Sequence, residues 1–167
     1  IRDAYIYEGQ LYLATRKGVL VSKDAKNFRQ LEEFGDDSFS GVTGRGDLMV
    51  FASFRDGVSL KNMKTKSVKK YSPEELKGNV IQGCYIDRSD RIWLSSLHGI
   101  VQLDEKREFN FFDDSNGLPV NTISCFFHDD ADNIWVGSLG KGMFRFPSSD
   151  FKYYDESTGF PSDLFLG

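Results

Sequence analysis

Residues Asp129–Gly142 read DDADNIWVGSLGKG, and residues Asp87–Gly99 read DRSDRIWLSSLHG. Both segments open with an acidic turn, continue into a short apolar strand that contains a tryptophan, and end with a small hydroxyl residue and a glycine. The two tryptophans, Trp93 and Trp135, lie 42 residues apart. A unit that recurs at this period is typical of a repeat architecture, so the repeat is defined before any single residue is interpreted.

The same spacing holds outside the tryptophan strands, since Ile81 and Ile123 are also 42 residues apart. Two weaker copies lie upstream, where residues 11–15 (LYLAT) and 49–53 (MVFAS) take the place of the tryptophan strand. The repeats therefore fill the chain. We predict one segment, residues 1–167, with repeats at approximately 1–36, 37–78, 79–120 and 121–162, and with 163–167 starting a fifth.

Short apolar stretches bounded by Gly, Asn, Asp or Pro predict four strands in each repeat. No segment of eight or more residues has a helical period, and Pro73–Lys77 makes at most one turn. Four short strands in about 42 residues are typical of a β-propeller blade. The predicted fold class is all-β, with four four-stranded antiparallel blades forming a partial propeller or arc. The predicted strands are 3–7, 10–15, 19–22, 28–31, 38–43, 48–53, 58–62, 67–71, 80–86, 91–95, 100–103, 108–112, 122–128, 133–137, 143–146 and 151–154.

The strands also predict how each blade packs. The first strand of the fourth repeat, residues 123–127, is apolar on both faces, as expected for an innermost strand between two neighbouring blades. The fourth strand alternates apolar and polar residues, as expected for an outer edge strand with one solvent-exposed face. We expect Trp93 and Trp135 to lie between adjacent blades as core residues.

Composition limits the possible classes of protein. The 167 residues are 40% hydrophobic and 14% aromatic, which is enough for a core and argues against disorder. The net charge of -4 argues against nucleic acid as a partner, because phosphate binding needs a basic surface. No apolar run reaches the roughly 18 residues of a membrane span. No secretory leader is evident, and we expect the chain to be a fragment of a longer protein.

The sequence carries no recognisable catalytic motif. The acidic turns lack the glycine and the distal glutamate of a calcium loop, so we predict that their aspartates only shape the turns. His98 and His128 occupy different places in the repeat, and no Cys/His pair has zinc spacing. We expect no catalytic residue, no metal and no cofactor in this segment.

The two cysteines are predicted to be free. In the repeat alignment Cys84 corresponds to Phe126, and Cys125 corresponds to Gly83, one position out of register. Their side chains should therefore point to opposite faces of their strands. We predict buried free thiols rather than a disulfide.

Binding is a stronger hypothesis than catalysis. In a propeller, the loops between the second and third strands and the loops that join blades meet at one mouth. Aromatic and charged groups at such a mouth suit a sugar or an acidic sugar, although solvated loop tips remain the alternative for each of them. The predicted ligand-binding residues are Arg16, Arg55, Glu74, His98, Asn116 and Lys141, and the same loops carry Lys17 and Phe54.

The segment Asn116–Ser138, NGLPVNTISCFFHDDADNIWVGS, resembles the two-component regulator propeller repeat. That repeat has a consensus similar to GLPsnxIxxIxxDxxGxIWIGTxxGL. The third repeat keeps Ile81, Asp87, Ile92, Trp93 and Gly99 of this pattern, whereas the first two repeats keep it loosely. The resemblance covers the chain and is specific in its second half.

The resemblance implies a function and a location. Such repeats form the extracytoplasmic sensor of hybrid two-component systems, in which a histidine kinase and an output domain follow, and many of these sensors detect oligosaccharides. It therefore implies a non-catalytic periplasmic segment of an inner-membrane protein that recognises an oligosaccharide or another small ligand. The alternatives are a fragment of a propeller enzyme that acts on glycans, as a lyase or glycosidase, and a protein-interaction scaffold.

Four repeats leave apolar blade faces open, and repeat arrays need capped ends. The expected partners are therefore the remaining blades of the parent chain or a second copy of this chain. A tight four-bladed ring, two arcs closed head to tail as an eight-bladed ring, and an arc capped by a neighbour are the three solutions. We favour self-association into the eight-bladed dimer, because a contact that copies the blade-to-blade joint closes with two-fold symmetry.

Overall fold

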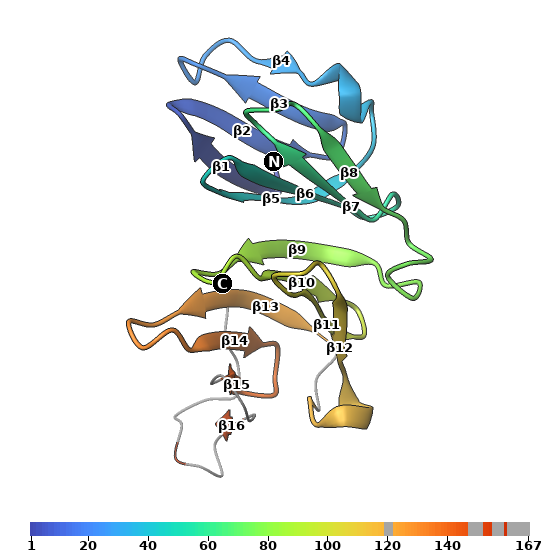
Figure 1. Cartoon of the computed structure of the whole chain (residues 1–167), viewed down its shortest axis with the longest axis vertical. Helices are drawn as coiled ribbons and strands as arrows, with labels where there is room; N and C mark the ends of the chain where they lie inside the picture. The colour runs from blue at the N-terminus through green and yellow to red at the C-terminus, as the bar shows by residue number, and fades with distance from the viewer. Residues whose placement is uncertain (119–121, 147–151, 155–158, 160–167) are drawn as a thin grey trace. The chain divides into compact units, whose positions relative to one another are not determined.

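The computed structural model describes residues 1–118, 122–146, 152–154 and 159. Its strands form four antiparallel sheets in chain order, β1-β2-β3-β4, β5-β6-β7-β8, β9-β10-β11-β12 and β13-β14-β15-β16 (Figure 1). Each sheet is one propeller blade, which confirms the predicted all-β class. The chain divides into two compact units, 1–86 and 87–167, which are described separately.

The first unit holds two complete sheets and one further strand. A single 3-10 turn, η1 (Glu32–Phe34), joins the two sheets. The strands are β1 (Asp3–Tyr7), β2 (Gln10–Thr15), β3 (Gly18–Ser22), β4 (Arg29–Gln30), β5 (Phe39–Arg45), β6 (Leu48–Ser53), β7 (Val58–Asn62), β8 (Val68–Tyr71) and β9 (Ile81–Ile86).

The second unit continues with short strands of the same kind and a second 3-10 turn, η2 (Asp114–Asn116). Its strands are β10 (Ile92–Ser96), β11 (Gly99–Leu103), β12 (Phe109–Phe112), β13 (Ile123–His128), β14 (Ile134–Ser138), β15 (Met143–Phe146) and β16 (Lys152–Tyr154). The end of the predicted fourth repeat and the start of the predicted fifth lie largely outside the described residues, so the repeat boundaries remain a prediction.

The core of the first unit lies between its first two sheets. Tyr12 of β2 and Phe51 of β6 are 4% and 0% exposed, and their rings lie 6.5 Å apart. Phe34 of η1 packs on Phe51 with 4.5 Å between ring centroids, and contacts Phe39 edge-on at 5.5 Å. Each sheet is only one layer thick, so its apolar face has to be covered by a neighbouring blade.

Polar bonds along the innermost strands fix the blades of the first unit against one another. The Tyr5 hydroxyl of β1 donates to the Gly44 carbonyl of β5 at 2.6 Å, and the Asp3 carboxylate accepts from the Val42 amide at 2.9 Å. The Ser40 hydroxyl of β5 donates to the Ile81 carbonyl of β9 at 2.7 Å. These contacts join equivalent strands of successive blades.

The second unit has an aromatic core around Trp93, which is 2% exposed. Its ring stacks on Phe112 at 6.3 Å and meets Phe146 of the next blade edge-on at 5.1 Å. The prediction that Trp93 lies between adjacent blades is confirmed. Trp135 is half-buried instead, because the structure describes no strand beyond β16 that could cover it.

Two packing predictions need correction. Both cysteines are free, but only Cys84 is partly buried, and Cys125 is exposed. Cys125 and Phe127, which is 61% exposed, lie on the same face of β13. Among the described residues no strand covers that face, so β13 is not packed on both sides as its apolar sequence predicts.

Candidate functional site

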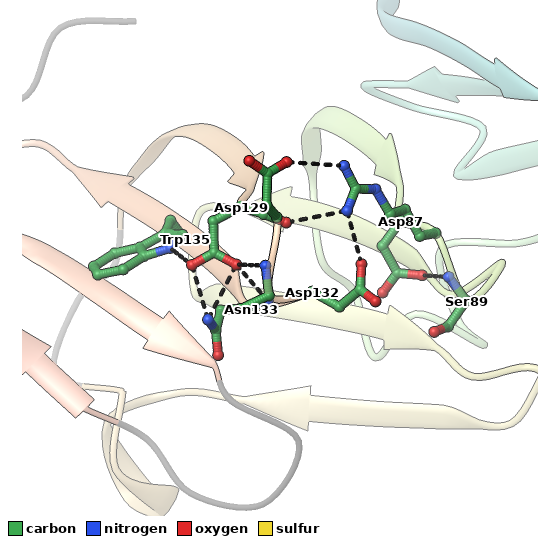
Figure 2. Close-up of polar contacts among 9 residues, drawn as sticks. Asp87, Ser89, Asp129, Asp132, Asn133 and Trp135 are labelled. Atoms are coloured by element: carbon green, nitrogen blue, oxygen red, sulfur yellow. Dashed lines mark hydrogen bonds and ion pairs between the residues drawn. The ribbon is translucent and has the colours of Figure 1, made fainter.

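Each blade of the second unit begins its second strand with an acidic turn closed by a tryptophan. The Asp129 carboxylate accepts a 2.8 Å hydrogen bond from the Trp135 indole N–H and bonds from the Asn133 side-chain amide at 2.8 and 3.0 Å (Figure 2). Asp87 accepts from the Trp93 indole at the same 2.8 Å. In each blade, the aspartate and the tryptophan six residues later therefore form a hydrogen bond that closes the turn. We call these two pairs, Asp87–Trp93 and Asp129–Trp135, the latches.

Other N–H groups of the same turn also donate to each of the two aspartates. Asp87 accepts from the amides of Ser89 and Arg91 at 2.9 and 3.0 Å, and from the Arg91 guanidinium at 2.6 Å. The residues at the fourth position of the two turns, Asp90 and Asp132, both adopt φ 59. These bonds confirm the prediction that the leading aspartates shape the turns.

The same bonds set the electrostatics of the fourth blade's turn. The indole N–H of Trp135, followed by the side-chain amide of Asn133, lowers the pKa of Asp129 to about 2. Hydrogen bonds to the ionised form stabilise it, so this carboxylate stays charged in neutral and mildly acidic solution.

Arg88 connects the two acidic turns of the second unit. Its guanidinium donates to the Asp129 carbonyl at 3.3 Å and to the Asp132 carboxylate at 3.1 Å, and it lies 3.6 Å from Asp130 (Figure 2). Arg88 occupies the repeat position of Asp130, so successive turns carry complementary charges.

The loops at the other end of these strands were predicted to form the ligand-binding mouth. A hydroxyl residue ends the second strand of each blade and folds the loop back on itself. Thr15, Ser96 and Ser138 donate to the carbonyls of Gly18, Gly99 and Gly142 at 2.8, 3.1 and 2.8 Å. In the second blade, Ser53 accepts from the amides of Arg55 and Asp56 at 3.1 and 3.0 Å and donates to the Asp37 carboxylate.

The glycine after each loop is required by geometry. Gly57 and Gly99 adopt φ +77 and +126. A Cβ atom at either position would lie 2.1 Å from a carbonyl oxygen of the blade's outermost strand, that of Tyr71 or Phe112. Only glycine fits there, which explains the hydroxyl-to-glycine spacing in the repeat.

Four of the six predicted ligand-binding residues lie at exposed positions in these loops. Arg16 and Arg55 lie in the β2–β3 and β6–β7 loops of the first unit, and His98 and Lys141 lie in the β10–β11 and β14–β15 loops of the second. They occupy comparable places in their blades. Their role in binding remains a prediction.

The other two predicted residues lie in the connections between blades. Glu74 is exposed in the β8–β9 connection, and the Ser72 hydroxyl lowers the pKa of its carboxyl. Asn116 ends η2, and its side chain is outside the described part of the structure. In the described residues of the first unit, no hydrogen bond or ion pair joins Arg16, Arg55 and Glu74 to one another.

Two leucines in the mouth loops were missed from the sequence, whereas Phe54 was placed there. Leu97 and Leu139 directly follow the hydroxyl residues of their loops and are 43% and 46% exposed. Phe54 has the same place in the second blade, and the Arg2 guanidinium lies 5.0 Å from the centroid of its ring. The signal in the sequence is the large apolar residue that follows the repeated serine.

A carboxylate pair lies beside the β6–β7 loop. Partial burial, followed by the nearby Asp37 carboxylate, raises the pKa of Asp56. Lys70 and Arg55 act in the opposite direction. The loop end of the first unit therefore offers both hydrogen-bond acceptors and cations.

Residues 117–140 match the family described as two component regulator propeller. The chain carries a two-component regulator propeller repeat. The matched segment contains the Asp129–Trp135 latch and the start of the loop that Ser138 folds. The resemblance seen in the sequence is thus confirmed in the fourth repeat.

Solved structures extend the likeness in fold to the other blades. The extracellular domain of a hybrid two-component system from B. thetaiotaomicron superposes with a TM-score of 0.76 at 19% identity, over 98% of this chain and 24% of that chain. Virginiamycin B lyase from Staphylococcus aureus gives 0.71 at 11% identity, over 92% and 54% of the two chains. YCF48 bound to D1 peptide gives 0.68 at 12%, over 98% and 55%.

At such low identities, the structural likeness shows the propeller fold alone. The chain spans about a quarter of the length of the first of these structures. No curated protein matches the sequence significantly. Among the described residues, no helix has the length and hydropathy of a membrane span.

Proposed function

We propose that this chain is an extracytoplasmic, ligand-sensing propeller segment of a hybrid two-component signal-transduction sensor that recognises an oligosaccharide. The match of residues 117–140 to the regulator propeller family carries this proposal. The likeness to the extracellular domain of a hybrid two-component system supports it over the whole chain. The segment itself is a non-catalytic part of a parent histidine kinase and lies in the periplasm.

The mouth loops supply chemistry that suits a sugar. Exposed cations, namely Arg16, Arg55 and Lys141, accompany the exposed leucines Leu97 and Leu139. Apolar surface packs on the C–H face of a sugar ring, whereas charged donors bind its hydroxyl groups. The mouth loops of each unit therefore offer both apolar surface and charged hydrogen-bond donors to a sugar.

Two other functions have some structural support. The likeness to virginiamycin B lyase favours a propeller enzyme, and the likeness to a propeller bound to a peptide favours a protein-interaction scaffold. Both rest on fold alone, at 11% and 12% identity. The sensor proposal has the family match in addition.

The proposed partners include other blades as well as the ligand. The exposed face of β13, which carries Cys125 and Phe127, is the kind of surface that a further blade of the parent chain would cover. A second copy of this chain, closing an eight-bladed ring, is the alternative occupant. Light scattering over a range of concentrations tests the second case, and a monomer at all concentrations would exclude it.

A binding screen tests the proposed function. The chain is applied to an array of neutral and acidic oligosaccharides, and the hits are titrated by calorimetry. We expect at least one hit to be weakened several-fold by Arg55→Ala or His98→Ala. Lys106→Ala, in the exposed turn between β11 and β12 at the opposite end of the blade, is the matched control. Turnover of a glycan would support the enzyme instead, and an array without hits would overturn the sensor proposal.

A further inference from the structure

The first unit contains a polar groove that the mouth loops do not line. Its volume is about 820 Å³, and its walls come from β1, β2, β4, η1, β7 and the turn after β7. The β1–β2 turn, which contains Glu8, lies on its rim. Since the β2–β3 loop leaves the opposite end of β2, the groove opens away from Arg16. It is therefore a separate surface from the predicted mouth.

The charges of the groove are balanced. Three acidic residues and three basic residues line it, and one of each kind, Glu33 and Lys61, form an ion pair. A phosphate or sulfate ligand needs an excess of cations, and a metal ion needs an excess of carboxylates. A lining with equal numbers of each, together with the amides of Gln10 and Gln30, suits an uncharged ligand rich in hydroxyl groups.

A tyrosine of β2 is among the residues that line this groove. Tyr12 is 4% exposed and lines the groove, and burial raises the pKa of its hydroxyl. Among the described residues, none exchanges a hydrogen bond with that hydroxyl, whereas the hydroxyl of neighbouring Tyr5 is bonded to the Gly44 carbonyl. A phenolic hydroxyl both donates and accepts hydrogen bonds, so it can pair with a hydroxyl group of a ligand.

A second hollow extends the surface. It has a volume of about 340 Å³ and shares Gln10 and Arg29 with the groove. Phe28, which is 41% exposed, lines this second hollow and provides an aromatic ring for the C–H face of a sugar. The two hollows, with Arg29 common to both, can accommodate a ligand of several linked rings.

We propose that the groove between the first two blades, with Tyr12, Arg29 and Gln10 as its polar contacts, binds a neutral oligosaccharide. The inference rests on the proposed function, because it assigns the oligosaccharide to a site. Tyr12 and Arg29 recognise ring hydroxyls, and Phe28 stacks on an adjoining ring. This saccharide surface would lie at the end of the first two blades opposite the mouth loops, separate from the contacts proposed there.

The test uses the whole chain and four neutral probes: maltohexaose, cellohexaose, xylohexaose and mannohexaose. Oligogalacturonate serves as the acidic probe, and a mixture of extended hexapeptides serves as the peptide probe. Each is titrated by calorimetry into the unchanged chain and into Tyr12→Phe and Arg29→Gln. Tyr5→Phe removes a half-buried hydroxyl outside the groove and is the matched control, whereas Arg16→Ala removes a mouth cation and tests the mouth as the alternative site.

We expect one neutral probe to bind, with a dissociation constant raised about three- to tenfold by Tyr12→Phe and by Arg29→Gln. Tyr5→Phe should change it less than about twofold, and Arg16→Ala should do the same if the probe binds in the groove. Circular dichroism of each variant separates lost binding from lost structure.

Three results would overturn the inference. Binding of a neutral probe that responds to Arg16→Ala and not to the groove variants places the ligand at the mouth and keeps the sensor proposal. Binding of oligogalacturonate or hexapeptides alone rejects a neutral ligand and leaves the proposed function to the array screen. Binding of no saccharide rejects both the groove and the oligosaccharide sensor.

Discussion

Replacing Asp87 with alanine should destabilise the second unit more than any other single change in its turns. Asp87 is 2% exposed, and its carboxylate accepts four N–H groups from Ser89, Arg91 and Trp93. With alanine at position 87, all four donors lose their acceptor.

The magnitude follows from which donors water can reach. Ser89 is exposed and Arg91 is half-buried, so water partly replaces the lost acceptor, at a combined cost of about 1 kcal/mol. Trp93 is 2% exposed, so its indole N–H stays buried without a partner, which costs about 2 kcal/mol. The expected loss in the free energy of unfolding is about 3 kcal/mol. Breaking the contact of Asp87 with the Arg91 guanidinium adds to this loss.

Urea unfolding followed by circular dichroism measures the effect without relying on Trp93 fluorescence. With an m-value of about 2 kcal/mol/M, the Asp87→Ala midpoint should fall by about 1.5 M. Asp104 is the control, because it accepts only two backbone amides, from Lys106 and Glu108, at 2.8 and 2.9 Å. Asp104→Ala should cost about 1 kcal/mol. Equal losses for the two variants would refute the reasoning about the indole.

Asp129 has a pKa lowered to about 2, so its hydrogen bonds stabilise the fold above about pH 4 and are lost as the pH falls towards 2. Asp129→Asn should flatten this part of the unfolding profile, and an unchanged profile would contradict the assignment. Arg88→Ala removes exposed contacts and should cost less than about 1 kcal/mol, with a smaller effect in 1 M salt, as urea midpoints at two salt concentrations will show. Gly99→Ala should cost more than about 2 kcal/mol by thermal unfolding, because the new methyl group meets a carbonyl oxygen at 2.1 Å. Gly46→Ala, at φ +54 with open space around it, should cost about 1 kcal/mol, and a reversed order would reject the steric argument.

The sequence predicts the strands of this chain well because the repeat supplies the same information four times. The turn aspartate, the tryptophan six residues later and the loop glycine mark both ends of a strand in the second unit. Even the weak first repeat is correct, with residues 10–15 forming β2 as predicted. The repeat period and the turn residues are local features of the sequence, so they can be recognised without a structure.

The candidate binding surfaces are much harder to predict from the sequence. Tyr12 has the pattern of a core strand residue, and only the structure shows that it also lines a groove. Glu33 and Lys61 are 28 residues apart in the chain and form an ion pair because two blades meet. The exposure of Leu97 and Leu139 likewise depends on loops that turn outward. Such sites arise from contacts between blades, which a repeat pattern does not encode.

This chain is a run of propeller blades, and we propose that it binds a saccharide. Two-dimensional NMR of the ¹⁵N-labelled chain, titrated with the neutral and acidic oligosaccharides named above, tests it most directly. We predict that amide shifts concentrate around the groove lined by Tyr12 and Arg29 or at the mouth loops, and leave the acidic turns unmoved. Spectra that stay unchanged with every oligosaccharide would contradict the claim.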